Sequence, residues 1–276
     1  MTHIAIVGAG LAGATVAARL RGLGYAGKIT LYGNEAAPPY DRPPLSKKYL
    51  LGHVRLEQLY LRPMAFYEQN DVTLRLGETV IAIEPRSNTL TTAGGKSESY
   101  THLVLATGSR PRRLSSRAGG DLNGVFVLRT HADVDAIVPE FASGRQALIV
   151  GGGYIGLEAA AVAASKGLRV TLIEQAARIL QRVASAETAN YFRSLHLSHG
   201  VVIKEGLGVS RLTGDGRVRA AELTDGSVLD LDFAIVGIGI VPETALAEAA
   251  GLEIDNGIKT DEFGRTSVGN IWAAGD

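Results

Sequence analysis

The fold of this chain is decided by the stretch Ala147-Leu148-Ile149-Val150-Gly151-Gly152-Gly153-Tyr154-Ile155-Gly156-Leu157-Glu158. An apolar run, typical of a buried strand, is followed by three spaced glycines and then by an alanine-rich segment that favours a helix. Gly151 permits a tight turn, Gly153 allows the backbone to approach a pyrophosphate, and Gly156 lets the helix pack on its strand. This order of elements predicts a dinucleotide-binding loop.

The same pattern occurs once before, at Ile4-Ala5-Ile6-Val7-Gly8-Ala9-Gly10-Leu11-Ala12-Gly13. Each loop is followed by a second apolar strand, at residues 28–32 and 168–174. Two loops of this kind predict two bound dinucleotides.

Acidic residues lie at the end of both second strands, at the distance where this type of unit keeps a carboxylate for a ribose. Glu35 lies 22 residues beyond Gly13, and Glu174 lies 18 residues beyond Gly156. Asn34 could bind a ribose by hydrogen bonding as well, so Asn34 and Glu35 both remain candidates.

Composition limits the class of protein. Of 276 residues, 46% are hydrophobic, and 28 basic residues balance 28 acidic ones, so the chain can bury a large core and nucleic acid is not expected as a partner. No apolar run approaches the ~18 residues of a membrane span. The first strand is expected to begin at His3 or Ile4, so we expect no signal peptide before it. We therefore expect a cytoplasmic protein without membrane insertion. With no cysteine in the sequence, redox chemistry has to use a bound organic cofactor.

The predicted elements indicate an α/β protein with two Rossmann-like, three-layer dinucleotide-binding domains and antiparallel β-meanders. Residues 72–83 and 88–92 alternate like short antiparallel strands, and residues 209–236 predict a second meander. The buried segment 234–242 returns the chain to the first domain, so the second domain is predicted to be inserted in the first. The expected boundaries are 1–112 with 237–276 for the first domain and 113–236 for the second.

Other segments also have features of ligand-binding loops. Prolines stiffen residues 38–48, where Arg42 and Lys47 could meet a pyrophosphate. An apolar strand at 102–108 ends in small residues, so its backbone can approach a ligand. His196 and His199 lie three apart on a predicted helix, but no carboxylate lies in register with them, and we predict no metal site.

Five runs, Gly8–Gly13, Tyr40–Lys47, Ala106–Gly108, Gly151–Glu158 and Trp272–Asp276, together resemble those of the FAD-dependent pyridine-nucleotide reductases. The chain is most similar to the NADH-dependent ferredoxin reductases that serve Rieske oxygenases and bacterial P450 systems, and the resemblance covers all 276 residues. It implies FAD in the first loop, NADH in the second, and an external iron–sulfur ferredoxin as electron acceptor.

The resemblance also implies which residues contact each cofactor. Those expected at FAD are Gly8, Gly10, Leu11, Ala12, Gly13, Asn34, Glu35, Arg42, Lys47, Val80, Ala106, Thr107, Gly108, Arg129 and Asp276, the last holding the ribityl chain. Those expected at NADH are Gly151, Gly153, Tyr154, Ile155, Gly156, Glu174, Gly237, Ile238 and Gly239.

Two of the implied residues carry the expected chemistry. Lys47 and Glu158 would form an ion pair beside flavin N5 and the nicotinamide, with hydride passing from NADH to FAD. Without the resemblance, a glutamate in the first turn of a helix would only complement the helix dipole. Glu174 can accept bonds from a ribose 2′-hydroxyl and would repel a 2′-phosphate, so NADH should be preferred over NADPH. Arg178, nearby in sequence, could weaken that preference.

One departure from the family lies at the end of the sequence. Family members continue past the Gly-Asp turn into a helix and a C-terminal interface domain that covers the flavin ring, whereas this sequence stops at Asp276. We expect weak flavin retention and self-association through the uncovered face. Two other functions stay open: a rubredoxin or quinone reductase of the same fold, and a non-catalytic nucleotide-binding fragment.

Overall fold

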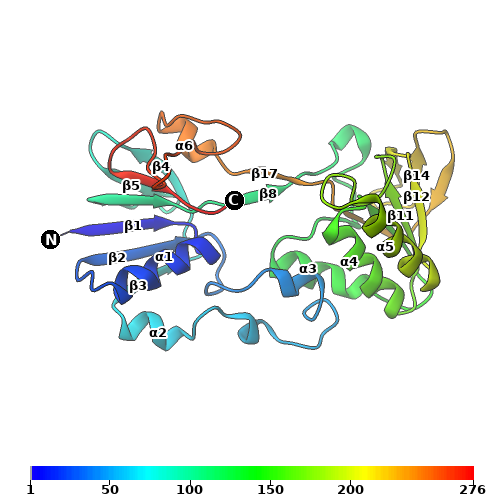
Figure 1. The fold of residues 1–276 in the computed structure, drawn as a ribbon, viewed down its shortest axis with the longest axis horizontal. Coiled ribbons are helices and arrows are strands. Elements are labelled where there is room, and N and C mark those ends of the chain that lie inside the picture. Colours follow the sequence, from blue (N-terminus) through cyan, green and yellow to red (C-terminus); the bar gives the residue numbers. More distant parts are fainter. Residues whose placement is uncertain (1) are drawn as a thin grey trace. The chain divides into compact units, whose positions relative to one another are not determined.

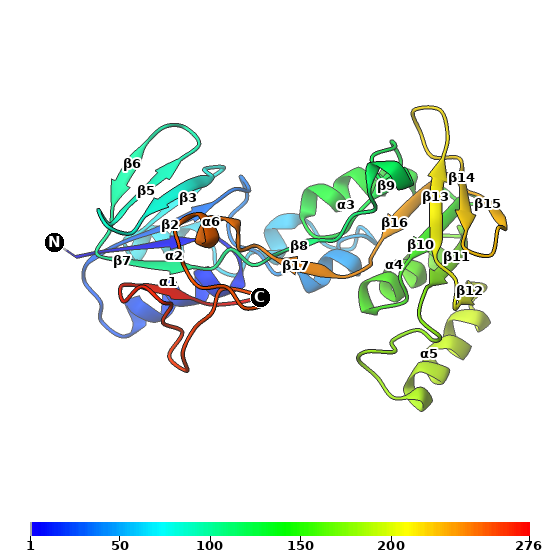
Figure 2. The same ribbon diagram turned by 90° about the horizontal axis from the view of Figure 1, so that it is seen from above.

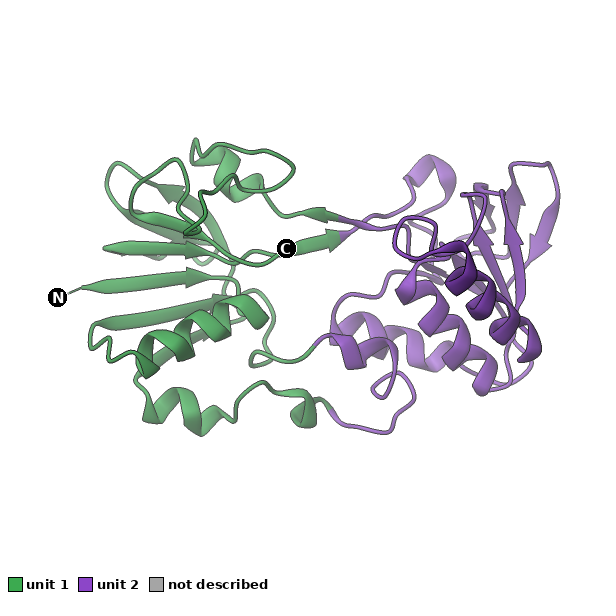
Figure 3. Ribbon diagram, in the orientation of Figure 1, with its two compact units in different colours: residues 1–41, 56–110, 241–276 green, residues 42–55, 111–240 purple. Residues whose placement is uncertain are grey.

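The computed structural model describes residues 2–276, which divide into two compact units (Figure 3). Unit 1 comprises Met1–Asp41, Leu56–Arg110 and Val241–Asp276, and unit 2 comprises Arg42–Arg55 and Pro111–Ile240. The chain passes from one unit to the other at four points: after Asp41, after Arg55, and within β8 (Ser109–Pro111) and β17 (Ile240–Pro242), which form a two-stranded sheet. The assignment of one cofactor to each domain stays a prediction.

A five-stranded parallel sheet with the order β18-β7-β1-β2-β3 forms the centre of unit 1 (Figure 1). Its central strand is β1, and the chain continues to β2 on one side and returns to β7 on the other. Ligands of open parallel sheets bind at such a reversal of strand order. The bounds are β1 (His3–Val7), β2 (Lys28–Gly33), β3 (Val72–Leu76), β7 (His102–Leu105) and β18 (Ile271–Ala273).

Helices cover one face of this sheet and an antiparallel sheet covers the other. Ala17 of α1 (Leu11–Gly22) and Tyr67 of α2 (Met64–Gln69) pack against Ile6 and Leu31. On the opposite face, Val7 and Leu105 pack against the antiparallel sheet and α6. The bounds of these elements are β4 (Val80–Glu84), β5 (Thr89–Thr92), β6 (Ser97–Ser99) and α6 (Ala245–Ala249).

The prediction of antiparallel strands over 72–83 is wrong for its first half. β3 pairs in parallel with β2, and the antiparallel pairing begins only at β4. The reason is that β3 is an edge strand, buried at Val72 and half-buried along the rest, so its sequence alternates although the sheet is parallel.

Unit 2 repeats the architecture of unit 1. Its parallel sheet has the order β12-β11-β10-β16-β9, with β10 in the centre (Figure 2). The bounds are β9 (Val125–Phe126), β10 (Gln146–Val150), β11 (Arg169–Glu174), β12 (Val202–Glu205) and β16 (Phe233–Val236). The predicted meander is the antiparallel sheet β13 (Val209–Thr213), β14 (Ala220–Leu223) and β15 (Val228–Asp230), whereas Phe233–Val236 joins the parallel sheet.

Small residues let the helix that follows the glycine loop of unit 2 lie flush on its sheet. In α4 (Tyr154–Ser165), Ala159, Ala160 and Ala163 are fully buried, and the helix contacts β10, β11 and β16. The meander packs on the other face through Leu212 and Leu223. The remaining helices are α3 (His131–Ile137) and α5 (Ala186–Ser198), with a 3-10 helix, η1, at Pro43–Ser46. None of the helices described within residues 2–276 has the length and hydropathy to cross a membrane.

Candidate cofactor-binding sites

The first glycine loop, Gly8–Gly13, connects β1 to α1. Gly8 has a φ of +118°, and a Cβ atom there would lie 1.9 Å from the carbonyl oxygen of Ala106, directly after β7. A Cβ at Gly13 would lie 2.0 Å from the carbonyl oxygen of Gly8. A Cβ at Gly10, by contrast, would meet no atom of the described residues within 4 Å. Packing therefore requires two of the glycines, and the third leaves open space.

The second glycine loop, Gly151–Gly156, has the same steric environment in unit 2. Gly151 has a φ of +109°, and its Cβ would lie 2.3 Å from the carbonyl oxygen of Gly237, directly after β16. A Cβ at Gly156 would lie 2.0 Å from the carbonyl oxygen of Gly151. Around Gly153 the described part of the chain again leaves 4 Å of free space.

Both loops fit the pyrophosphate of a dinucleotide. Gly10 and Gly153 are the N-cap residues of 12-residue helices, and neither helix start has a side-chain cap. The N–H groups of the first turn are thus left for an anion, which the helix dipole also favours. The free space beside each N-cap is where a dinucleotide backbone approaches such a loop.

Two candidate ribose ligands directly follow β2. Glu35 is partly buried, and its Oε2 accepts a hydrogen bond of 2.6 Å from the Tyr40 hydroxyl. Asn34 is exposed beside it. Both side chains follow β2 at the carboxyl end of the sheet, so the choice between them stays open.

The C-terminal turn of unit 1 lies beside the first glycine loop. A Cβ at Gly275 would lie 3.2 Å from the Cβ of Ala12 in α1, and Oδ2 of Asp276 accepts a hydrogen bond of 3.1 Å from the Ser109 hydroxyl. Leu11, 62% exposed, opens α1, and Val80, 8% exposed, begins β4. The predicted FAD residues Ala106, Thr107 and Gly108 directly follow β7.

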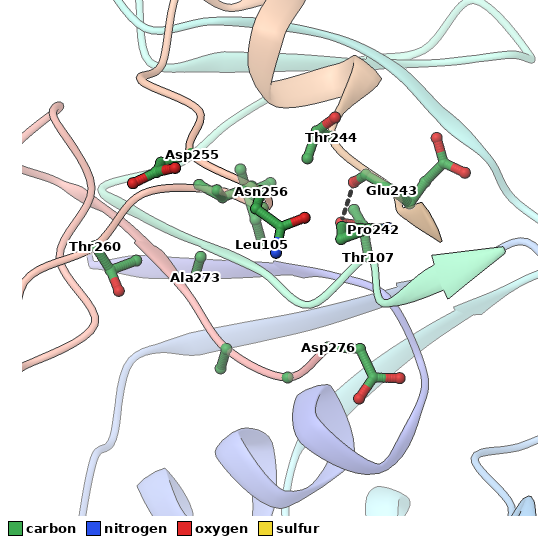
Figure 4. A pocket seen from close by; sticks show the side chains of 14 residues that line it. Leu105, Thr107, Pro242, Glu243, Thr244, Asp255, Asn256, Thr260, Ala273 and Asp276 are labelled. Carbon is green, nitrogen blue, oxygen red and sulfur yellow. Dashed lines mark hydrogen bonds between the residues drawn. The ribbon is translucent and has the colours of Figure 1, made fainter. Parts of the chain in front are cut away.

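A polar cavity of about 250 Å³ adjoins this turn (Figure 4). Thr107 lines it and donates a 2.7 Å hydrogen bond to the carbonyl oxygen of Glu243. Glu243, Asp255 and Asp276 also line it. Sequence reasoning missed this cavity because its wall joins loops that lie more than a hundred residues apart in the chain.

In the second site, the predicted acid contacts its own glycine loop. Oε2 of Glu174 accepts a 2.7 Å hydrogen bond from the Gly152 N–H, and Oε1 accepts one of 2.7 Å from the Ala176 N–H. Each carboxylate oxygen retains a second acceptor position, so the side chain can hold the loop and still bind ribose hydroxyls.

The side chain of Arg178 is hydrogen-bonded to the backbone of the loop that follows β11. Its Nη2 donates to the carbonyl of Ala184 at 2.9 Å, and longer bonds of 3.4 Å reach the carbonyls of Ile179, Gln181 and Ser185. The guanidinium therefore stabilises the loop after β11, and the expectation that it weakens the preference for NADH stays a prediction.

The turn Gly237–Gly239 lies next to two arginines that the sequence did not single out. A Cβ at Gly239 would lie 3.8 Å from Nη2 of Arg182 and 3.8 Å from Cδ of Arg112. Tyr154 and Ile155, at the start of α4, are 55% and 40% exposed. All of the residues predicted for NADH thus lie in unit 2, around the carboxyl ends of β10, β11 and β16.

Four of the predicted residues form two contact pairs in unit 2. Lys47 Nζ lies 2.8 Å from Oε2 of Glu158, so the predicted ion pair is present. Nη1 of Arg42 donates to the carbonyl oxygen of Arg129 at 2.8 Å. These contacts explain why residues 42–55 group with unit 2, whereas the sequence analysis counted them in the first domain.

The helix position of Glu158 differs from the expectation. α4 begins at Tyr154 and has no acidic residue in its first turn, so Glu158 is the fifth helical residue. Its carboxylate is therefore held by the side chains that contact it rather than by the helix dipole alone.

No group of three or more histidine, aspartate or glutamate side chains among residues 2–276 could hold a metal ion. His196 is buried, with Nε2 3.0 Å from the carbonyl oxygen of Leu157 and Nδ1 2.8 Å from that of Phe192. It joins α5 to α4.

Two parallel sheets, each with a glycine loop at the reversal of its strand order, define a protein that binds two dinucleotides. The family model described as pyridine nucleotide-disulphide oxidoreductase matches residues 2–276, and the chain belongs to this family.

Relatives give this membership more detail. The chain is 44% identical over 273 residues to the 5,5'-dehydrodivanillate O-demethylase ferredoxin reductase subunit of Sphingobium sp., covering 98% of this chain and 66% of that protein. It is 42% identical to a ferredoxin–NAD(P)(+) reductase of Sphingomonas sp., covering 100% and 67%. A crystal structure of a covalent putidaredoxin reductase–putidaredoxin complex superposes with a TM-score of 0.96 at 40% identity, covering 100% of this chain and 67% of that chain.

These findings confirm the family resemblance, the fold class and the cofactor pair of FAD and NAD(H). The chain spans about two thirds of the length of the relatives it matches.

Proposed function

We propose that this chain takes a hydride from NADH onto FAD and passes single electrons to an iron–sulfur ferredoxin. The observation that carries the proposal is the pair of matched glycine loops, one in each unit, together with the Lys47–Glu158 ion pair. The ferredoxin reductases among its relatives support the same activity.

Unit 1 would hold FAD. The N–H groups at the start of α1 bind the pyrophosphate, Asn34 or Glu35 binds the adenosine ribose, and Asp276 binds the ribityl chain. Bound FAD supplies the acceptor for two electrons and their release one at a time. With no cysteine among the 276 residues, no internal disulfide can take these electrons.

Unit 2 would hold NADH. The first turn of α4 binds the pyrophosphate, and Glu174 accepts hydrogen bonds from the ribose. At ~4 Å and an effective dielectric constant near 20, Glu174 would repel each charge of a 2′-phosphate by up to ~4 kcal/mol, which favours NADH over NADPH.

Lys47 and Glu158 would act at the reacting end of the cofactors. The Lys47 ammonium stabilises negative charge on the reduced flavin, and Glu158 orients Lys47 or the nicotinamide carboxamide. Arg42 and Arg129 would contribute to FAD binding, and the hydrogen bond between them supports a shared position.

An iron–sulfur ferredoxin is the acceptor that we propose. One solved relative is a complex of a reductase with putidaredoxin, and two curated relatives are named ferredoxin reductases. Rubredoxin and quinone reduction differ only in the docking surface, so an acceptor screen with the three classes separates them. A cytoplasmic location and self-association stay predictions, the second checked by the mass of the purified chain in solution.

Rapid mixing of the FAD-loaded chain with NADH tests the hydride transfer. We expect the flavin absorbance to bleach in a single exponential phase and to recover when oxidised ferredoxin is added. If the flavin absorbance does not change on mixing with NADH while FAD is bound, the proposal is refuted and a non-catalytic nucleotide-binding fragment is favoured.

A further inference from the structure

The carboxylate of Glu158 has a second partner besides Lys47. Oε2 of Glu158 accepts a hydrogen bond of 2.5 Å from the hydroxyl of Ser46, in addition to the 2.8 Å contact with Lys47 Nζ. Ser46 is 4% exposed, whereas the side chains of Lys47 and Glu158 are 48% and 29% exposed. One oxygen atom thus joins a buried donor to a solvent-accessible one.

The Ser46 hydroxyl donates its hydrogen bond to the carboxylate of Glu158. A serine hydroxyl has one proton to donate, and its other nearby acceptor, the carbonyl oxygen of Pro43, is 3.4 Å away. The shorter contact is of the kind formed between a hydroxyl and an ionised carboxylate. The Pro43 carbonyl instead accepts a 3.1 Å hydrogen bond from Lys47 Nζ.

Ser46 is held more firmly than either charged side chain. It ends η1, whose first positions are prolines, and the adjacent Leu45 is 1% exposed. The segment is also fastened by the Tyr49 hydroxyl, which donates to Asp135 of α3 at 2.8 Å. A serine has one side-chain torsion to fix, whereas lysine and glutamate have several.

An exposed ion pair does not hold one geometry without help. Solvent screening and side-chain entropy leave such pairs weakly populated in any single arrangement. A reaction that needs reacting groups within a few tenths of an ångström requires a fixed support for the charged groups.

We propose that Ser46 is a positioning residue, which fixes Oε2 of Glu158 and through it the Lys47 ammonium. The proposal rests on the proposed function for its catalytic meaning, because the roles of Lys47 and Glu158 belong to that function. The contact itself is a property of unit 2 and can be tested without any cofactor.

The first experiment measures the exposure of the Lys47 amine in the flavin-free chain. The chain and its variants are acylated with an amine-reactive ester, and mass spectrometry gives the rate at each lysine. In Ser46→Ala we expect Lys47 to react about two- to fivefold faster, the factor that corresponds to an exposed ion pair. Ser46→Thr, which keeps the hydroxyl, should react like the parent, and the exposed neighbour Lys48 should not change in either variant.

An unchanged Lys47 rate in a folded Ser46→Ala chain would overturn the proposal. Folding is checked by circular dichroism. If Ser46→Ala does not fold, Glu158→Gln and Ser46→Thr still test it: the first must free Lys47 and the second must not.

The second experiment links the position to the reaction. With FAD bound, the limiting rate of flavin reduction by NADH should fall at least about tenfold in Ser46→Ala, with less change in the NADH concentration at half-saturation. The reduction potential of bound FAD should become more negative, because the cation is no longer held. Faster labelling with no change in rate or potential would keep the contact and reject the role of Lys47 in the proposed function.

Discussion

In unit 1, Gly8 and Gly13 press against backbone carbonyls while Gly10 faces open space, and in unit 2 Gly151, Gly156 and Gly153 do the same. The glycine loops are therefore two copies of one steric arrangement. The comparison separates two reasons for a glycine. Gly8 and Gly13 in the first loop, and Gly151, Gly152 and Gly156 in the second, are small because the protein packs against itself there. Gly10 and Gly153 leave the open space that we propose for a ligand.

The two sites differ in how the acidic residue is placed. The register of β1 with β2 and of β10 with β11 makes Gly33 the counterpart of Glu174. A Cβ at Gly33 would lie 2.6 Å from the Cβ of Ala9, so the methyl group of Ala9 occupies that space. In the second loop the counterpart of Ala9 is Gly152, which leaves room for Glu174 to accept its N–H. The methyl group of Ala9 thus fills the space that Glu174 uses in the second site, and the candidate ribose ligands of the first site, Asn34 and Glu35, lie one and two residues beyond Gly33.

The largest expected effect comes from adding a methyl group to the helix glycine that packs against each loop. Gly13→Ala and Gly156→Ala place a Cβ about 2 Å from a carbonyl oxygen, and each should destabilise its unit by at least about 2 kcal/mol. Denaturant unfolding checks this, because Trp272, the single tryptophan, reports unit 1 and circular dichroism reports both units.

The matched control is Gly22→Ala, in α1 like Gly13, where a Cβ meets no described atom within 4 Å. It should leave the tryptophan transition in place or raise it slightly, since alanine favours helix over glycine. Equal transitions for Gly13→Ala and Gly22→Ala would contradict the steric argument.

The next effect concerns the open positions. Gly10 and Gly153 have extended backbone angles that alanine adopts without strain, so alanine there should lower the unfolding midpoints only slightly, because alanine is a poorer N-cap residue than glycine. The added methyl occupies the approach of the pyrophosphate, and affinity should fall at least about tenfold. Gly10→Ala should weaken FAD and spare NADH, and Gly153→Ala should do the reverse. Calorimetric titration of both variants with both cofactors gives the four affinities, and a loss of both cofactors in one variant would argue against separate sites.

A third effect should distinguish the role of Glu174 from that of Glu35. Glu174→Arg is expected to narrow the preference for NADH over NADPH by about tenfold or more, because repulsion of a 2′-phosphate becomes attraction. Glu174→Gln removes the charge alone and should narrow the preference less, while weakening the hold on the Gly152 N–H. Steady-state kinetics with both nucleotides measures the ratio, and Glu35→Gln should leave it unchanged. A parent chain that uses NADH and NADPH equally would refute the role of Glu174.

The smallest effect is a difference in acid stability at the start of the two central strands. β1 begins at His3, and β10 begins at Gln146. His3 is 8% exposed, and burial lowers its pKa below the ordinary 6.5, although the Ser99 carbonyl hydrogen-bonded to Nδ1 raises it in part. The unfolded chain therefore binds a proton more readily than the folded one below pH 6.5.

The stability that neutral His3 contributes is present above pH 6.5 and is lost as the pH falls toward its lowered folded value. Between pH 6.5 and 5.5 unit 1 should lose up to about 1 kcal/mol, and His3→Gln, which imitates Gln146, should remove this part of the slope. Denaturant midpoints from Trp272 fluorescence at the two pH values measure the difference. An identical pH slope in the parent and in His3→Gln would show that another group is responsible.

Both glycine loops, most strands and helices and the acidic residues at the ends of β2 and β11 were predictable, because each depends on local rules. A tight turn needs glycine, a buried strand is apolar, and a helix on a sheet needs small residues. The parallel pairing of β3 was not predictable, since an edge strand in either kind of sheet can alternate.

The sequence of this chain, read without its fold, specifies two dinucleotide loops and the residue types around them, since these signals span fewer than thirty residues each. The hydrogen bond from Ser46 to Glu158 joins residues 112 apart, and the exchange of Ala9 and Gly33 for Gly152 and Glu174 depends on strand register. Such contacts form only when the folded chain places distant segments within a few ångströms, and no local pattern encodes that distance.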